Sequence, residues 1–178
     1  MHILTEGCSK HFIYQYSSRT GASFIEAKSS SSNINAPDIA WFGGSGLKDE
    51  FFASELEKKP WLQIHVEPML GVSGIIIKNR KDEQGESFEN VQIRAGSSSS
   101  IQDNDVVGTF KGPGVTGGEQ YIQFSKRFME NGVEYVTIEI TSESPAVLAV
   151  DGLTMMSGGM PQNSHTNLCG NVLKVLNE

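Results

Sequence analysis

Residues 60–96 read PWLQIHVEPMLGVSGIIIKNRKDEQGESFENVQIRAG, and this stretch decides the fold of the chain. Apolar and polar residues alternate over 62–66, which is the period-2 pattern of a strand buried on one face. The run 72–77 ends in three isoleucines and indicates a strand covered on both sides. A second alternation follows at 91–94. The stretch therefore predicts three strands, with the polar turn 79–86 between the last two.

The turn 79–86, NRKDEQGE, concentrates charge and hydrogen-bonding groups between two buried strands. In a β-sandwich such a connection lies at one end of the molecule, where binding loops gather. The turn therefore favours a binding module over an enzyme. No G-x-S-x-G, H-E-x-x-H or phosphate-binding loop occurs in the sequence, which also argues against catalysis.

Composition sets limits on the partners of this chain. With 178 residues, 38% of them hydrophobic, the chain fits one domain with a sizeable core. The net charge of −7, with 14 Lys and Arg that form no basic cluster, argues against nucleic acid as a partner. No apolar run reaches the roughly 20 residues of a membrane span. The N-terminus lacks the features of a signal peptide, so we expect either a cytosolic protein or a mature or excised piece of a secreted one.

The two cysteines, Cys8 and Cys169, lie near opposite ends of the chain. A bond between them would tie the ends together and, in the chain-entropy model, add about 4–5 kcal/mol of stability. The alternatives are two unpaired thiols, or a Cys169 bonded to another chain, and sequence alone leaves these open. Zinc is not expected, because no CxxC motif or nearby histidine pair accompanies them.

The remaining sequence continues the β pattern. Some eight short strands are predicted, separated by connections rich in Gly, Ser and Asn, and the last of them spans 146–156. One short helix is expected at 48–57, before Pro60. We therefore predict an all-β, antiparallel sandwich over residues 1–156, with its core at about 20–156, followed by a C-terminal tail at 157–178 that a bond at Cys169 would hold back on the domain.

Several motifs resemble those of a known family. The order PWLQI at 60–64, III at 75–77, NRxDxxGE at 79–86 and NVxIRxG at 90–96 is similar to the discoidin, or coagulation factor V/VIII type C, domains. The resemblance is nearest to their fucose-binding lectin branch, the fucolectins. The segments VEYVTI at 133–138 and LAVDGL at 148–153 also resemble strands of that family. The similarity covers about residues 20–156.

This resemblance implies an eight-stranded, galactose-binding-like jelly roll that is not catalytic and holds its ligand in loops at one end. Fucolectins bind fucose through a histidine and two arginines beside aromatic side chains. Arg80 matches the first arginine, whereas Ser87 stands where the second is expected. Matching Trp41 and Phe42 to the aromatic loop places Gly43 where the histidine is expected. Two of the three polar contacts to the sugar are therefore replaced.

The candidate ligand site combines five residues. Arg80 supplies a planar fork of donors, Asp82 or Glu86 an acceptor, and Trp41 with Phe42 an aromatic face for a sugar ring. The alternative for Arg80 and Asp82 is a structural ion pair, or a carboxylate that accepts from the backbone amides of the turn. The alternative for the two aromatic residues is packing beneath the long loop.

Calcium is a separate expectation, which also comes from the resemblance. Asp38 aligns with the early acidic loop position of the family, and Asp151 with the acidic residue of its closing strand. Together with carbonyl oxygens from residues 33–40, they would offer the oxygen ligands that calcium prefers. The alternative is a pair of solvated loop aspartates.

Two functions follow as hypotheses. The first is a carbohydrate-binding module at the cell surface or outside the cell, with a glycan or glycoprotein as its partner. The second is an adhesion or recognition module that keeps the discoidin scaffold, has lost the sugar site and binds another surface protein. In either case an oligomer would add avidity.

Overall fold

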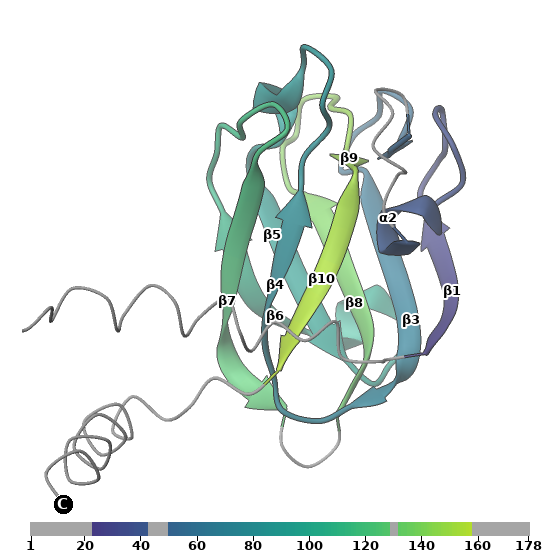
Figure 1. Cartoon of the computed structure of the whole chain (residues 1–178), viewed down its shortest axis with the longest axis vertical. Coiled ribbons are helices and arrows are strands. Elements are labelled where there is room, and N and C mark those ends of the chain that lie inside the picture. Colours follow the sequence, from purple (N-terminus) through teal and green to yellow (C-terminus); the bar gives the residue numbers. More distant parts are fainter. Residues whose placement is uncertain (1–22, 43–49, 129–131, 158–178) are drawn as a thin grey trace, which may run out of the picture.

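The computed structural model describes residues 23–42, 50–128 and 132–157, which form a sandwich of two antiparallel sheets (Figure 1). The larger sheet has five strands, in the order β1 (Phe24–Ser29), β3 (Trp61–Met69), β8 (Val133–Ile140), β5 (Val91–Gly96) and β6 (Asp105–Phe110). The smaller sheet has three, in the order β10 (Gly152–Ser157), β4 (Val72–Lys78) and β7 (Glu119–Phe128). These eight strands confirm the predicted antiparallel jelly-roll sandwich.

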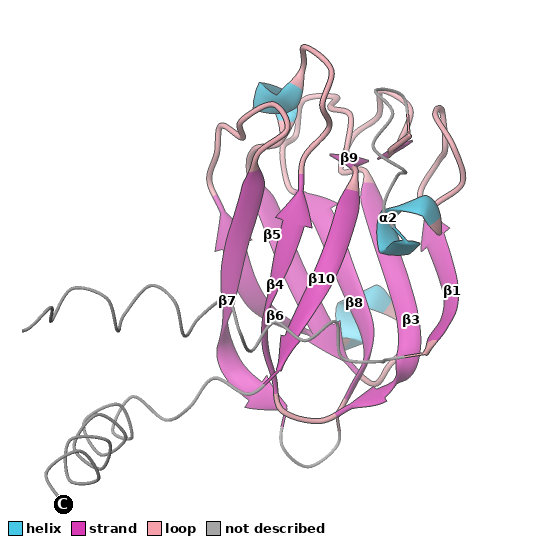
Figure 2. Cartoon of the chain, in the orientation of Figure 1, coloured by secondary structure: helices cyan, strands magenta, loops and turns pink. Residues whose placement is uncertain are grey.

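Short elements complete the described part of the chain (Figure 2). Two two-residue strands, β2 (Phe52–Ala53) and β9 (Ala149–Val150), pair with each other outside the two main sheets. The helical elements are equally short: α2 (Ile39–Phe42), η1 (Gly85–Ser87) and η2 (Ile101–Asp103). None of the helices in the described ranges is long and apolar enough to cross a membrane.

The core forms where the inner faces of the two sheets meet. In β3 the prediction holds for the inner face, because the side chains of Leu62, Ile64 and Val66 are fully buried. On the other face it fails at Gln63, which is 5% exposed and donates to the hydroxyl of Thr137 at 3.2 Å. The partners of the inner residues across β8 repeat the pattern, with Ile64 opposite Val136 and Leu62 opposite Ile138. Since successive residues of a strand point to opposite faces, this register places one continuous apolar layer inside the sandwich.

The isoleucine run of β4 differs in part from the prediction. Ile75 and Ile77 are fully buried, but Ile76 is only partly buried and lies in register with Tyr121 of β7 and Thr154 of β10. The strand is therefore buried mainly on one face, and three adjacent isoleucines did not imply full cover on both sides.

Two predicted elements were wrong. The segment expected as a helix at 48–57 contains β2, whose residues are buried and pair with β9. Burial of adjacent residues in an extended chain overrides the weak helical pattern. The single strand expected at 146–156 is divided at Asp151 into β9 and β10, because its first part turns away to pair with β2.

The chain path separates the connections into two ends. One end, here called the loop end, carries residues 54–60, 79–90, 111–118 and 141–148 and lies at the top of Figure 1. The opposite end carries the connections 70–71 and 97–104. Residues far apart in sequence therefore meet at the loop end.

Some sequence predictions fall outside the described residues. Cys8 and Cys169 lie in the ranges 1–22 and 158–178, so the disulfide prediction stays untested. Of the predicted tail 157–178, Ser157 ends β10 and the rest lies outside the described residues, as does Gly43, the position matched to the family histidine.

Truncation at the centre of the core tests this packing. Ile138 is fully buried in β8, so we expect Ile138→Ala to reduce the free energy of unfolding by about 2–5 kcal/mol. Val106 in β6 is 44% exposed, and Val106→Ala should cost about 0.5 kcal/mol or less. Urea unfolding of both variants measures the difference, and similar losses would contradict the assigned inner face of the five-stranded sheet.

Candidate functional site

A buried asparagine fixes the turn 79–86 at the loop end. Asn79 is fully buried, and its side-chain amide donates to the carbonyl oxygens of Gly85 at 2.6 Å and Val115 at 3.1 Å. Its side-chain oxygen accepts from the backbone N–H of Arg80 at 2.9 Å. One side chain thus closes the turn on itself and joins it to the neighbouring loop 111–118.

Further bonds hold the turn and the loop 111–118 together. The N–H of Gly117 donates to the carbonyl oxygen of Arg80 at 2.7 Å, and the N–H of Gly85 donates to the hydroxyl of Thr116 at 3.1 Å. A Cβ at Gly85 would collide with the backbone of Thr116. Glycine at this position therefore permits the close approach of the two loops.

Arg80 and Asp82, two of the predicted ligand residues, form an ion pair with each other. The Nε and one terminal amino group of Arg80 each donate to a different carboxylate oxygen of Asp82. The guanidinium carbon also lies 4.8 Å from the centre of the Phe51 ring. The side chain of Arg80 is 6% exposed and that of Asp82 is 22% exposed. This geometry favours the structural alternative for Arg80, because two of its donors are committed to Asp82.

Trp41 packs on the side of the sandwich. Its ring stacks on Phe24 of β1 with centroids 6.3 Å apart, and Ala40 beside it is fully buried. The short helix α2 lies beside β10, at the side of the sandwich where β1 also runs (Figure 1). This arrangement favours the packing alternative for Trp41. The side chain of Phe42 lies outside the described residues, so its assigned role stays a prediction.

Glu86 is more open than Arg80, Asp82 and Trp41, the other predicted ligand residues whose side chains are described. It lies in η1 and is exposed, and the next residue, Ser87, donates its hydroxyl to the carbonyl oxygen of Gln84 at 2.8 Å. Ser87, which stands where the second fucolectin arginine was expected, therefore closes η1 locally.

Asp151, one of the two residues expected to bind calcium, is buried beside two lysines. Its carboxylate is 2% exposed, and one oxygen lies 3.3 Å from Lys78 Nζ and 3.2 Å from Lys81 Nζ. Two ammonium groups at this oxygen repel a further cation, so the carboxylate as placed does not fit a calcium ion. Asp38 is exposed just before α2. The predicted calcium site, which combines Asp38, Asp151 and carbonyl oxygens of residues 33–40, stays untested, and the two lysines at Asp151 argue against it.

Sequence reasoning missed three residues that shape the loop end: Phe51, Lys78 and Lys81. The sequence contains features that point to the two lysines, but these features do not show which distant residues the lysines contact. Lys78 and Lys81 flank the NR pair of the turn, and Asp151 interrupts an apolar strand, which marks it as a buried charge in need of partners. Nothing in the sequence around Phe51 indicates that its ring would lie against an arginine 29 positions later.

Solved structures provide the comparison for this arrangement, since no family model and no curated protein matches the sequence. The lectin domain of lectinolysin complexed with Lewis B antigen matches with a TM-score of 0.61 and 16% identity, over 79% of this chain and 96% of that chain. The chain has a discoidin-like fold. The solved structure confirms, for the fold alone, the similarity to discoidin domains that residues 60–96 predicted.

Two further structures share the discoidin-like fold. An f-lectin (fucolectin) from striped bass serum matches with a TM-score of 0.62 and 22% identity, over 77% of this chain and 48% of that chain. The family 32 carbohydrate-binding module of NanJ from C. perfringens, in complex with galactose, matches with a TM-score of 0.58 and 12% identity, over 73% and 91%. Both lectins and carbohydrate-binding modules therefore use this architecture.

Because Arg80 is paired with Asp82, we expect a small change at Asp82 to lower the stability of the fold substantially. Asp82→Asn keeps the shape of the side chain but leaves the buried guanidinium without its counter-charge. We expect a loss of about 2–3 kcal/mol, somewhat below the cost at a fully buried pair because Asp82 is partly exposed. Urea unfolding measures the loss. Glu83→Gln, an exposed acid in the same turn, is the matched control, and an equal effect of both changes would contradict the pairing.

The lysine pair at Asp151 predicts indifference to calcium. An ion bound to the folded state at a hundredfold excess over its Kd would add about 2.7 kcal/mol and raise Tm by several degrees. Because Lys78 and Lys81 already compensate Asp151, we expect the same Tm in excess calcium and in chelator. A thermal melt measures this, with magnesium as the control. A rise in Tm specific to calcium would show that the loop binds the ion despite the lysines.

Proposed function

We propose that this chain is a non-catalytic carbohydrate-binding module that holds its ligand at the loop end. The observation that carries the proposal is the turn 79–86, which is held by internal hydrogen bonds yet presents polar side chains at its surface. A preorganised loop loses little entropy on binding, which favours recognition of small polar ligands. Discoidin-like structures solved with Lewis B antigen and with galactose support the ligand class.

Three side chains of the turn supply the polar groups. Lys81 is 28% exposed and donates, Asp82 is 22% exposed and accepts, and Glu86 is exposed and accepts. Neutral sugars are recognised by such a mixture of fixed donors and acceptors, since each hydroxyl can serve as either. In this arrangement Arg80 acts through Asp82, whose carboxylate it orients, rather than by direct contact with the sugar.

The natural partner would be a glycan or a glycoprotein, and the place of action the cell surface or the extracellular space. Glycans are displayed there in many copies. Weak single sites then gain avidity if the protein forms an oligomer or is joined to other modules.

A specific observation favours recognition of a protein as the second candidate. Leu56 is 70% exposed and Val115 is 65% exposed, and both lie in connections at the loop end. Exposed aliphatic side chains beside a fixed polar turn suit an adhesion surface for another protein. The commitment of Arg80 to Asp82 points the same way, since it removes donors that the fucolectins give to fucose.

A glycan array separates the two candidates. We expect the full-length protein to bind a limited set of glycans, and Glu86→Ala to weaken that binding about tenfold through loss of one charged hydrogen bond. Glu67→Ala, which removes an exposed carboxylate from β3 near the opposite end, is the matched control and should bind normally.

The outcomes of the array differ clearly. If the array gives no signal with protein that a melting curve shows to be folded, the carbohydrate-binding proposal is contradicted. Protein recognition is then the remaining candidate function. Binding that Glu86→Ala and Glu67→Ala reduce equally would place the site away from the turn 79–86.

A further inference from the structure

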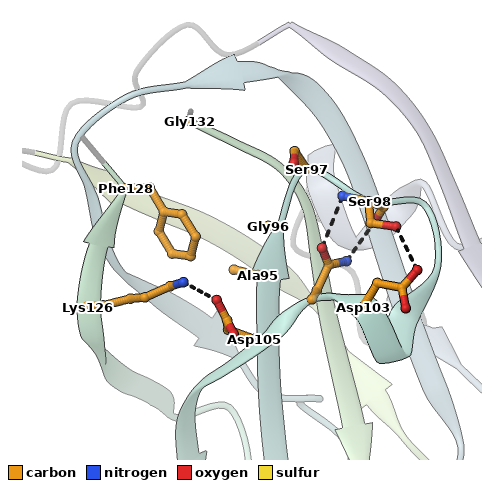
Figure 3. Close-up of a pocket in the computed structure, with 10 residues that line it drawn as sticks. Ala95, Gly96, Ser97, Ser98, Asp103, Asp105, Lys126, Phe128 and Gly132 are labelled. Atoms are coloured by element: carbon orange, nitrogen blue, oxygen red, sulfur yellow. Dashed lines mark hydrogen bonds and ion pairs between the residues drawn. The ribbon is translucent and has the colours of Figure 1, made fainter. Parts of the chain in front are cut away.

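A hollow of about 210 Å³ lies at the end of the sandwich opposite the loop end (Figure 3). It forms where β5 ends at Gly96, β6 begins at Asp105 and β7 ends at Phe128. Strand β5 runs the length of the sandwich between the two ends, so about 20 Å separates this hollow from the turn 79–86. The two places therefore cannot belong to one small-ligand site.

The wall of the hollow is built by a buried asparagine. Asn104 is 4% exposed, and its side-chain amide donates to the carbonyl oxygens of Ser98 at 2.7 Å and Ser100 at 3.4 Å. Its side-chain oxygen accepts from the N–H of Ser98 at 3.1 Å. A Cβ at Gly96 would collide with this side chain. The loop 97–104 is thus held in one shape before any ligand arrives.

The lining combines an aromatic wall with paired charges. The ring of Phe128 packs edge-on against Phe124, with centroids 6.3 Å apart, and Lys126 Nζ lies 4.8 Å from the centre of the Phe128 ring. Lys126 is also paired with the carboxylate of Asp105. Figure 3 shows Phe128 and Lys126 on one side of the hollow and Ser98 on the other.

The opposite side offers hydroxyl and carboxylate groups. Ser97 and Asp103 are exposed, and the hydroxyl of Ser98 lies 3.5 Å from the carboxylate of Asp103. Donors and acceptors therefore face the hollow from one side, and an apolar ring and an ammonium group from the other. A ligand with hydroxyl groups on its edge and C–H groups on its face complements both sides.

We propose that this hollow is a second binding site, which takes a small, neutral, hydroxyl-rich ligand such as one sugar ring or a polyol. Its volume lies below the roughly 300–1,000 Å³ of pockets for larger ligands, so a single ring is the appropriate size. The carboxylates of Asp103 and Asp105 disfavour an anion, and Lys126 is already paired with Asp105, so the hydroxyl groups and the aromatic wall suit a neutral ligand. This site stands independently of the one proposed at the loop end.

Amide chemical shifts of the full-length, ¹⁵N-labelled protein test the proposal. Galactose, fucose and xylitol serve as neutral probes, and acetate as a charged probe. We expect at least one neutral probe to shift the amides of residues 97–104 saturably, with an affinity in the millimolar range, and acetate to leave them unchanged. Ser97→Trp, which fills the hollow, should weaken binding by at least about tenfold.

Ser99→Trp is the matched control, because Ser99 is exposed in the same loop but does not line the hollow. It should change the affinity by less than about twofold. The proposal is overturned if no neutral probe shifts residues 97–104 saturably, or if both tryptophan variants bind equally well. Shifts confined to the turn 79–86 would overturn this second site and support the loop-end site. Shifts confined to 97–104 would support the second site and argue against the loop-end site for these probes.

Discussion

Two charges buried at the loop end must be compensated, and the shape of this end depends on which groups pair with them. Arg80 is 6% exposed and Asp151 is 2% exposed. An unpaired charge in either position would cost several kcal/mol, so each needs a partner from another part of the turn or strand. Asp82 and the Phe51 ring compensate Arg80, while Lys78 and Lys81 compensate Asp151. These contacts hold the turn 79–86 against β2 and the start of β10.

This compensation changes how a ligand would be recognised. Arg80, the residue matched to the first fucolectin arginine, here donates to the carboxylate of Asp82. Glu86 is the exposed polar group of the turn, whereas Lys81 is 28% exposed and already lies against Asp151. Matching residues by sequence alone does not reveal that two donors of this arginine are already committed within the turn. The discoidin-like scaffold is retained, but its loop end has its own chemistry.

The hollow at the opposite end illustrates why a polar loop should be considered for function as well as for packing. Its serine run and its Asp-Asn-Asp sequence are ordinary surface-loop composition. In the folded chain Asn104 turns inward and organises the loop, which leaves Ser97 and Asp103 at the surface. The sequence did not distinguish the organising residue from its exposed neighbours.

The β-sandwich could be predicted from alternation along strands such as 62–66 and 136–140, whose apolar residues form the inner face. The sequence also singled out Arg80 and Asp82, with a structural role in the turn as the alternative to ligand binding. The folded chain was needed to show that Arg80 lies on Phe51, that Trp41 packs against Phe24, and that two lysines compensate Asp151. The difference lies in the sequence separation of the interacting residues. Periodicity depends on neighbours in the chain, whereas compensation of a buried charge depends on which distant segments the fold brings to it.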